Sequence, residues 1–296
     1  MEGRNRARLM LNLVKQVRSG LSVLNPEEIR KLSHRPVHIG LVAADDGYRE
    51  MEALLEPATA EGEQPVRLAG FVHRAGDPGS PDTVDLVLYQ QGIPRPNGAY
   101  TFYGNDPLRT VREILDSNPK LAPALARRFP VFRGKVVDRI IKSVAKENAI
   151  FAVVTALPDV IPTLAEIPWI FGEFASDTAF ITGNQIRMAF LIASACGREI
   201  GYSNQKTEML TIAASAFGWR AIARELAGKI PLGAGLIPKG AIAYAATYAI
   251  GKALERLHIT GKALSHTERE RVYREGLERG RAVAGSLPQA QVSERP

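Results

Sequence analysis

Residues 37–56, VHIGLVAADDGYREMEALLE, contain the pattern that decides the fold. A short run of apolar and branched residues is followed by an acidic turn and then by a segment with helical periodicity. Two more branched-rich runs follow at 66–72 (VRLAGFV) and 84–90 (VDLVLYQ), and AYTFY at 99–103 is a candidate fourth strand. A helix between the first two strands is typical of a βαβ unit, so we expect a small, mainly parallel sheet.

The turn after the first run lies where many α/β proteins bind a phosphate at a helix N-terminus. A phosphate-binding loop needs a lysine for the β and γ phosphates and a Ser or Thr hydroxyl for magnesium. Here Tyr48 and Arg49 follow Gly47 in place of those residues. Asp45 and Asp46 can instead accept the free N–H groups of the first helical turn and offset the helix dipole. We interpret the junction as a degenerate P-loop that is capped by its own carboxylates and has lost nucleotide binding.

The end of the third run shows the same loss. GTPases have Asp-x-x-Gly there, whereas this chain has YQQG at 89–92, and no Asn-Lys-x-Asp base-recognition motif occurs. A response-regulator receiver domain is a rival template, but its phosphate-accepting position holds Gln90, and an amide forms no acyl phosphate. The positions of the degenerate phosphate site are Asp45, Asp46, Gly47, Gln90 and Gly92.

A metal bound by Asp45, Asp46 and Asp85 is a further alternative for the same turn. It is less favoured because Asp85 precedes the third run, at the strand's start, whereas the other two carboxylates follow the end of theirs.

Helical periodicity dominates from Pro119 onward. The expected organisation is a basic amphipathic helical segment, a small Rossmann-like α/β domain, an all-α helical domain, a polar helix and a disordered tail, over residues 1–35, 36–118, 119–260, 261–285 and 286–296. The polar helix contains HTERERVYREGLERGRA (266–282), which is charged all round and has Glu–Arg pairs four residues apart. We therefore expect it to be a solvated helix.

The composition indicates the cellular compartment. The chain has 296 residues, a formal net charge of +7 and one cysteine, so no internal disulfide can form and a cytoplasmic location is expected. Residues 4–24 are basic and amphipathic, which suits either an anionic membrane surface or docking onto the chain itself. Charges and prolines interrupt the most apolar windows, 148–172 and 230–251, which argues against a simple transmembrane span. A hairpin inserted at the inner face of the cell membrane is the alternative.

Three segments of the helical half carry a family resemblance: NQIRM at 184–188, GWR and REL between 218 and 226, and AYAATYAIG at 243–251. Within residues 146–256 they resemble the YcjF-like, GTPase-associated family, a bacterial domain of unknown function. The resemblance implies a GTPase partner, because members are often fused to GTPases or encoded near them, and some members are membrane proteins. It also favours a degenerate G-domain as the interpretation of the N-terminal half.

Arg187 lies among apolar neighbours within the first of these segments. A buried charge needs a partner, and the acids in the preceding helices are Asp159, Glu166 and Asp177. We expect a polar latch between Arg187 and one of them; the alternative is a guanidinium that reaches solvent.

No zinc spacing, nucleophile elbow, Cys–His pair or Gly-rich cradle occurs, so no catalytic residue, cofactor or metal is assigned. We expect a non-catalytic, membrane-associated adaptor or regulator linked to a GTPase system, with a homo-oligomer left open. A soluble nucleotide-binding switch, with nucleotide hydrolysis as its reaction, is the first alternative. A basic nucleic-acid-binding protein is the second, and is disfavoured because aromatic residues do not alternate with basic ones.

Overall fold

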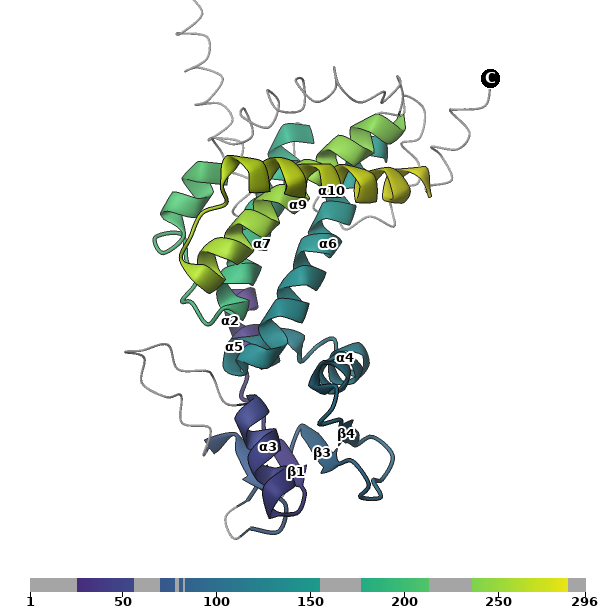
Figure 1. Cartoon of the computed structure of the whole chain (residues 1–296). Helices are drawn as coiled ribbons and strands as arrows, with labels where there is room; N and C mark the ends of the chain where they lie inside the picture. The colour runs from purple at the N-terminus through teal and green to yellow at the C-terminus, as the bar shows by residue number, and fades with distance from the viewer. Residues whose placement is uncertain are drawn as a thin grey trace, which may run out of the picture. The chain divides into compact units, whose positions relative to one another are not determined.

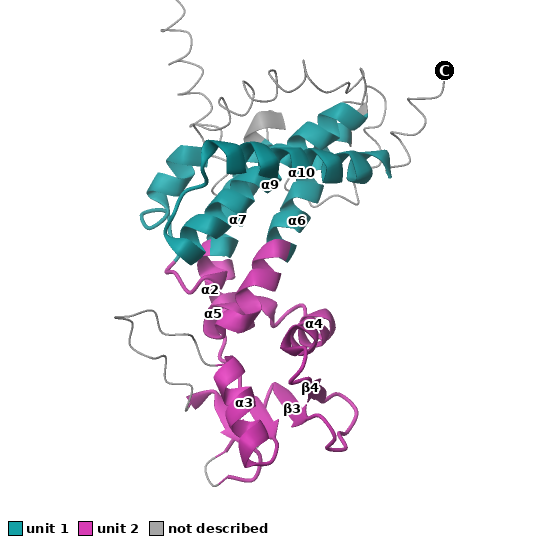
Figure 2. Ribbon diagram, in the orientation of Figure 1, with its two compact units in different colours: residues 1–26, 139–192, 200–296 teal, residues 27–138, 193–199 magenta. Residues whose placement is uncertain are grey.

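The computed structural model describes residues 26–55, 70–77, 80–81, 83–154, 177–212 and 236–286 (Figure 1). It divides into two compact units, shown in different colours in Figure 2. Residues 27–138 and 193–199 form the α/β unit, and residues 1–26, 139–192 and 200–296 form the helical unit. The α/β unit is thus longer than the 36–118 expected from the sequence, because it also includes residues 27–35, 119–138 and 193–199.

The sheet has four strands in the order β2-β1-β3-β4, and all three pairings are parallel. The strands are β1 (Ile39–Val42), β2 (Val72–Arg74), β3 (Leu86–Gln90) and β4 (Tyr100–Phe102). The expected parallel sheet is confirmed, including its fourth strand. The second strand begins later than the run VRLAGFV suggested, and residues 66–69 lie outside the described part of the chain.

Two helices cover one face of this sheet. Helix α3 (Asp45–Leu55) follows β1, and Gly47 lies against the side chain of Gln90. Helix α4 (Pro107–Ser117) follows β4, and Asn118 after it donates a hydrogen bond from Nδ2 to the hydroxyl of Tyr100, at 2.6 Å. Gln90 and Tyr100 share a face, because Leu88 pairs with Tyr100 and side chains alternate along a strand.

That helix-covered face forms the core of the sheet. Its strand residues Ile39, Leu41, Leu86, Leu88 and Phe102 are each at most 3% exposed. Met51 and Leu55 of α3 and Val111, Ile114 and Leu115 of α4 are buried as well. The side chain of Asp106 caps α4 by accepting a hydrogen bond from Arg109 N, and Pro107 stands at the first helical position, where a missing N–H costs nothing.

The rest of the α/β unit is helical. Helix α2 (Pro26–His34) precedes the sheet, and α5 (Ala122–Arg128) leads into the first turns of α6 (Pro130–Val154). Leu125, Phe129 and Phe132 are buried here, with the two phenylalanine rings edge to face.

The helical unit contains most of α6 and α7 (Asp177–Ala195), together with α9 (Leu236–Thr260) and α10 (His266–Gly285). Helix α10 crosses α9 in close contact (Figure 1). A Cβ on Gly280 would lie 2.8 Å from Ala241 O, and one on Gly276 would lie 2.9 Å from Ala245 Cα. Small residues on both helices therefore let the two backbones approach closely.

The prediction of a solvated helix at 266–282 is wrong. One side of α10 is buried, namely Val272, Tyr273, Gly276, Leu277, Gly280 and Ala284. These residues recur at spacings of one, three and four, which is a helical face. Val272, Tyr273 and Leu277 are apolar, but Gly276 and Gly280 carry no hydrophobic signal, so the face stood out too weakly in the sequence.

No helix within the described residues is long and apolar enough to cross a bilayer. Of the two apolar windows considered for a hairpin, residues 155–172 and 230–235 lie outside the described ranges, as does the amphipathic helix at 4–24. Residues 148–154 and 236–251 belong to α6 and α9.

Candidate functional site

The carboxyl-terminal edge of the sheet is where the degenerate phosphate site was expected. In parallel α/β sheets, ligands bind outside this edge, in the crevice between strands whose connections run in opposite directions. Here β1 and β3 are such neighbours. Gln90, the last residue of β3, accepts a hydrogen bond from Ala44 N through its Oε1 atom, at 3.0 Å. Its amide group also lies 2.3–2.6 Å from where a Cβ on Gly47 would be, so only a glycine leaves room for it.

The two aspartates do not take that position. Asp45 Oδ1 lies 2.5 Å from Arg74 Nη2, with its side chain 75% exposed. The hydrogen bond from Arg74, followed by the charge of that guanidinium, holds the pKa of Asp45 below its usual value. Asp46 is also exposed, and Gly92 forms the turn after β3 with a φ of +95°. The group that fills the start of α3 is thus the neutral amide of Gln90, and the aspartates face solvent.

The alternative metal site is not assembled. Asp85 lies at the opposite edge of the sheet, where its carboxylate accepts hydrogen bonds from His38 N, at 2.9 Å, and from Arg35, at 2.7 Å. Asp45 and Asp46 lie beyond the other end of β1. Among the residues that the structure describes, no three His, Cys, Asp or Glu side chains come close enough to hold a metal ion.

The structure brings together two histidines that lie 35 positions apart in the sequence. His38 Nδ1 lies 3.0 Å from His73 Nε2, and the two rings are stacked with centroids 5.3 Å apart. Burial, and then the neighbouring His38, lower the pKa of His73. One facing nitrogen therefore donates a hydrogen bond to the other. Strand alternation places both histidines on one face, because His73 pairs with Gly40 and His38 lies two residues before Gly40, but this register is given by the structure and not by the sequence.

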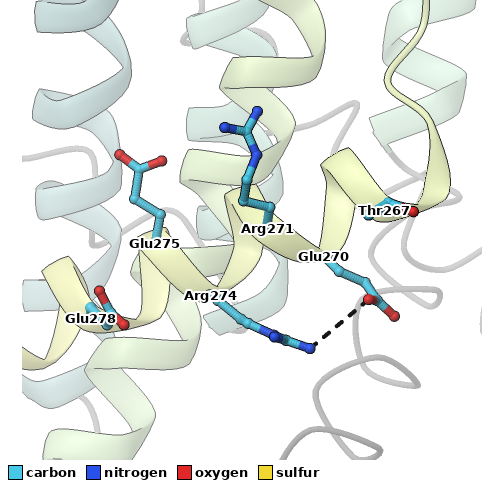
Figure 3. Close-up of a pocket in the computed structure, with 6 residues that line it drawn as sticks. All are labelled: Thr267, Glu270, Arg271, Arg274, Glu275 and Glu278. Carbon is cyan, nitrogen blue, oxygen red and sulfur yellow. Dashed lines mark ion pairs between the residues drawn. The ribbon is translucent and has the colours of Figure 1, made fainter.

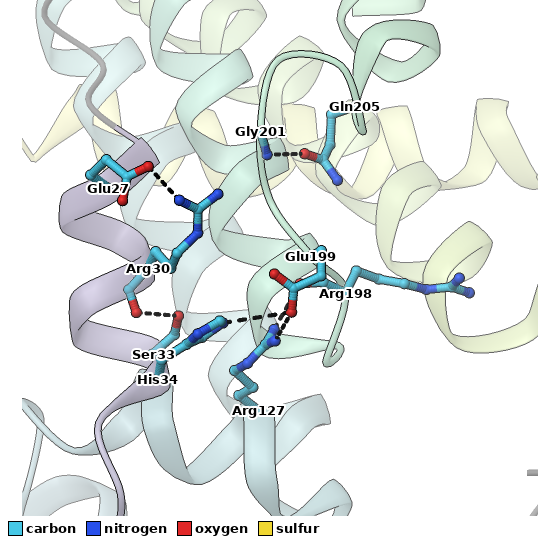
Figure 4. Close-up of polar contacts among 9 residues, drawn as sticks. All are labelled: Glu27, Arg30, Ser33, His34, Arg127, Arg198, Glu199, Gly201 and Gln205. Atoms are coloured by element: carbon cyan, nitrogen blue, oxygen red, sulfur yellow. Dashed lines mark hydrogen bonds and ion pairs between the residues drawn. The ribbon is translucent and has the colours of Figure 1, made fainter.

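A second polar cluster lies within the α/β unit (Figure 4). Arg127 donates hydrogen bonds to the carboxylate of Glu199, at 2.5 Å, and to the carbonyl of Arg198, at 2.7 Å. His34 Nε2 lies 3.9 Å from the same carboxylate. Burial, and then Arg127, lower the pKa of His34, so this imidazole is neutral near pH 7 and its contact with Glu199 is not a strong ion pair. Arg127 is the group that ties Glu199 to α5.

The helical unit contains a buried polar network that joins three helices. Asn148 on α6 donates to Thr247 Oγ1 on α9, at 2.9 Å, and Gln185 on α7 donates to the same oxygen, at 3.2 Å. Thr247 in turn donates to Ala243 O, at 2.9 Å, and Asn184 donates to Asn148 Oδ1, at 3.0 Å. Asn148 and Thr247 are each 0% exposed. Two segments that carry the family resemblance, 184–188 and 243–251, thus meet in space through hydrogen bonds.

The network reaches the surface at Arg187. This guanidinium pairs with Glu147 on α6, at 2.5 Å, and also donates to Asn184 Oδ1, at 2.9 Å. The side chains of Arg187 and Glu147 are 34% and 42% exposed. The pair is therefore a half-exposed interhelical ion pair whose acidic member, Glu147, the sequence analysis missed.

Of the acids expected to pair with Arg187, Asp159 and Glu166 lie outside the described residues. Asp177 begins the helix that contains Arg187. Asp177 and Arg187 are ten positions apart, about 15 Å along the helix axis, which is too far for an ion pair.

A shallow surface depression of about 330 Å³ lies along α10 (Figure 3). Its lining alternates in charge: Thr267, Glu270, Arg271, Arg274, Glu275 and Glu278. Glu275 accepts hydrogen bonds from Tyr248 and Arg279, and Glu270 lies 4.0 Å from Arg274. The acids are thus largely compensated by neighbouring cations, which leaves no net charge to select a ligand.

Comparison of the chain with protein-family models, with curated proteins and with solved structures gave no match. The structure shows a mixed α+β protein with a small parallel sheet, a helix α3 at whose start Ala44 N donates to Gln90, and a helical unit with a buried network of amide side chains.

Proposed function

We propose that this protein is a non-catalytic adaptor or regulator that acts with a GTPase and associates peripherally with the inner face of the cell membrane. The α/β unit would present a protein-binding surface, and the helical unit would serve as a rigid scaffold. The family resemblance of residues 146–256 supports the link to a GTPase.

One observation carries the proposal: Gln90 Oε1 accepts the hydrogen bond of Ala44 N at the start of α3. Backbone N–H groups at this point are the groups that would cradle a phosphate. An uncharged amide, held 3.0 Å from that nitrogen, satisfies the donor without any ligand. Tyr48 and Arg49 occupy the positions where the lysine and the hydroxyl residue of a phosphate loop would be needed.

Calorimetry tests the loss of nucleotide binding. Purified full-length protein is titrated with GTP, GDP and ATP in the presence of magnesium, and we expect no binding heat. Micromolar uptake of any of the three would overturn the adaptor proposal in favour of an active switch. A Gln90→Ala variant, titrated in parallel, asks whether the amide alone blocks the site; we expect no uptake there either, because the lysine is missing.

Fractionation and flotation test the membrane part. We expect the protein in the membrane fraction of cells and its release by a carbonate wash, as for a peripheral protein. Vesicles containing phosphatidylglycerol should bind the protein more strongly than neutral phosphatidylcholine vesicles, since residues 4–24 are basic. Protein found wholly in the soluble fraction would remove membrane association from the proposal.

Binding to a GTPase encoded in the same cell tests the proposed partnership. We expect the protein to bind that GTPase with different affinities in its GTP-bound and GDP-bound states, or to change its hydrolysis rate. Equal affinity for both states and an unchanged rate would contradict a regulatory role.

A further inference from the structure

The face of the sheet opposite α3 and α4 is not covered by any described helix. We call it the open face, and it comprises His38, Gly40, Val42, His73, Val87, Tyr89 and Thr101. Only Gly40 is buried, beneath the side chain of Val84, whereas the other six side chains are half-buried. On the helix-covered face, by contrast, the aliphatic side chains are almost fully buried. Parallel sheets normally have both faces covered, so this difference between the faces is unusual.

The strand connections explain why this layer is missing. Crossovers between parallel strands are right-handed, so connections that run in opposite directions along a sheet place their helices on opposite faces. The β1–β2 connection runs one way and contains α3, whereas the β2–β3 and β3–β4 connections run the other way. These two span only residues 75–85 and 91–99, fewer than the dozen or so residues that a crossover helix needs. The helices that would cover the open face are therefore absent from these connections.

Two cations border the open face. Arg95 donates hydrogen bonds to Thr101 Oγ1, at 3.0 Å, and to Ala99 O, which holds it over the β4 end of this face. Arg128 lies 3.8 Å from the centroid of the Phe71 ring, which in turn lies tilted against His38 at the β1–β2 end, with centroids 5.7 Å apart. Neither guanidinium forms an ion pair with a described residue, and Asp85, which precedes β3, is already bound by Arg35. The border is thus positively charged, and its centre, Val42, Val87 and Tyr89, is mainly apolar.

We propose that the open face is the docking surface for an amphipathic helix of a partner protein, with an apolar stripe and carboxylates on its flanks. The stripe would cover Val42, Val87 and Tyr89 and restore the missing layer, and the carboxylates would pair with Arg95 and Arg128. This inference rests on the proposed adaptor function and names the surface through which it acts.

The positive charge of the border favours an acid-flanked partner helix over other occupants of the open face. The chain's own segment 4–24 carries Arg4, Arg6, Arg8, Lys15 and Arg18, which would repel the basic border. A second copy docked face to face would bring Arg95 and Arg128 against the same two cations. Single-stranded nucleic acid stacks successive bases on open aromatic rings. Here the rings of His38, His73 and Phe71 pack on one another and under Arg128, which leaves Tyr89 as the ring at the centre of the face.

Site-specific photo-crosslinking in living cells tests the proposal. The photoreactive residue p-benzoylphenylalanine replaces Tyr89 in the full-length chain, and mass spectrometry maps the peptide to which it links. Tyr202 in the helical unit is the matched control position, since its side chain is an exposed aromatic outside the α/β unit. We expect a Tyr89-specific adduct with an apolar, acid-flanked helical segment of a separate protein.

Charge reversal adds a second measurement. Arg95→Glu should lower the yield of this adduct about ten-fold, because it places like charges together. Arg112→Glu, on the exposed side of α4, should leave the yield unchanged. Circular dichroism of each variant checks that the fold is retained.

Four outcomes would overturn the docking proposal: an adduct with residues 4–24, one with a second, isotopically labelled copy, one with nucleic acid, or none above the Tyr202 control. In each case the adaptor function would survive if calorimetry still showed no nucleotide uptake. Nucleotide uptake would instead remove the adaptor function, whatever Tyr89 contacts.

Discussion

The polar network of the helical unit and the polar groups at the carboxyl-terminal edge of the sheet use similar side chains in opposite surroundings. Thr247 and Asn148 are 0% exposed and form their hydrogen bonds away from water. Gln90 and Asp45 also form hydrogen bonds, at 3.0 and 2.5 Å, but at the surface. Similar geometry therefore implies different energetic consequences, because water can replace a lost partner at the edge and not in the core.

The largest loss of stability is expected for a substitution at the centre of the buried polar network. Thr247→Val keeps the shape of the side chain but removes the oxygen that accepts hydrogen bonds from Asn148 and Gln185. Two buried amide donors would be left unsatisfied, at about 1–3 kcal/mol each, so we expect a loss of roughly 3 kcal/mol in the free energy of unfolding.

Thr260→Val is the matched control, because Thr260 lies on the same helix and its hydroxyl also donates to a carbonyl four residues earlier, but it is exposed. Urea unfolding followed by circular dichroism measures both variants. Equal losses in the two would show that burial does not distinguish these hydroxyls.

A pH titration examines a buried hydroxyl in the same unit. Tyr273 on α10 is 1% exposed, and burial raises its pKa from 10 to about 12. Its stabilising contribution is complete below pH 10, where both states are protonated, and is lost as the pH rises toward 12, because the unfolded state releases the proton first. We expect a total loss of about 2–3 kcal/mol at 1.36 kcal/mol per pH unit.

The Tyr273→Phe variant should not show this decline between pH 10 and 12. Urea unfolding of both proteins at several pH values compares their slopes. Parallel slopes would mean that another group is responsible.

The third-largest loss of stability is expected at the contact between α9 and α10, where no polar group is involved. Gly280→Ala would place a Cβ 2.8 Å from Ala241 O and force α10 away from α9. Overpacking costs about 1–3 kcal/mol and helix propensity gains about 1 kcal/mol, so we expect a net loss of up to about 2 kcal/mol.

Gly285→Ala, near the end of the same helix, meets only Ile237 Cδ1, at 3.8 Å. We expect this control to be neutral or slightly stabilising by thermal unfolding. A Gly280→Ala variant as stable as Gly285→Ala would argue against close helix packing.

The smallest loss of stability is expected at the carboxyl-terminal edge of the sheet. Gln90→Ala removes the acceptor of Ala44 N, but water can take its place, so we expect a loss below about 1 kcal/mol. Amide hydrogen exchange at Ala44 should nevertheless become faster, with Gln91→Ala as the control in the adjacent exposed position. A loss as large as that of Thr247→Val would erase the difference between the two regions.

In the α/β unit, the periodicity of apolar residues predicted the strands and helices correctly. Alternating branched residues predicted the parallel strands, and the spacing of Met51 and Leu55 agrees with the buried side of α3. The same reasoning failed for α10, because its contact face depends on Gly276 and Gly280, which carry no hydrophobic signal. Thr247 and Asn148 are recognisable in the sequence as polar residues within apolar helical runs. The sequence does not indicate, however, that they form a hydrogen bond with each other.

Local sequence by itself determined the strands and helices of the described residues and the lack of a phosphate-loop lysine after Gly47, because periodicity and residue identity are properties of neighbouring residues. Only the tertiary structure decided that Gln90 fills the start of α3, that Arg187 pairs with Glu147 and that His38 meets His73. Each of these contacts joins residues at least 35 positions apart in the chain. Their partners are selected by the register of strands and the crossing of helices, and neither is written in any one segment.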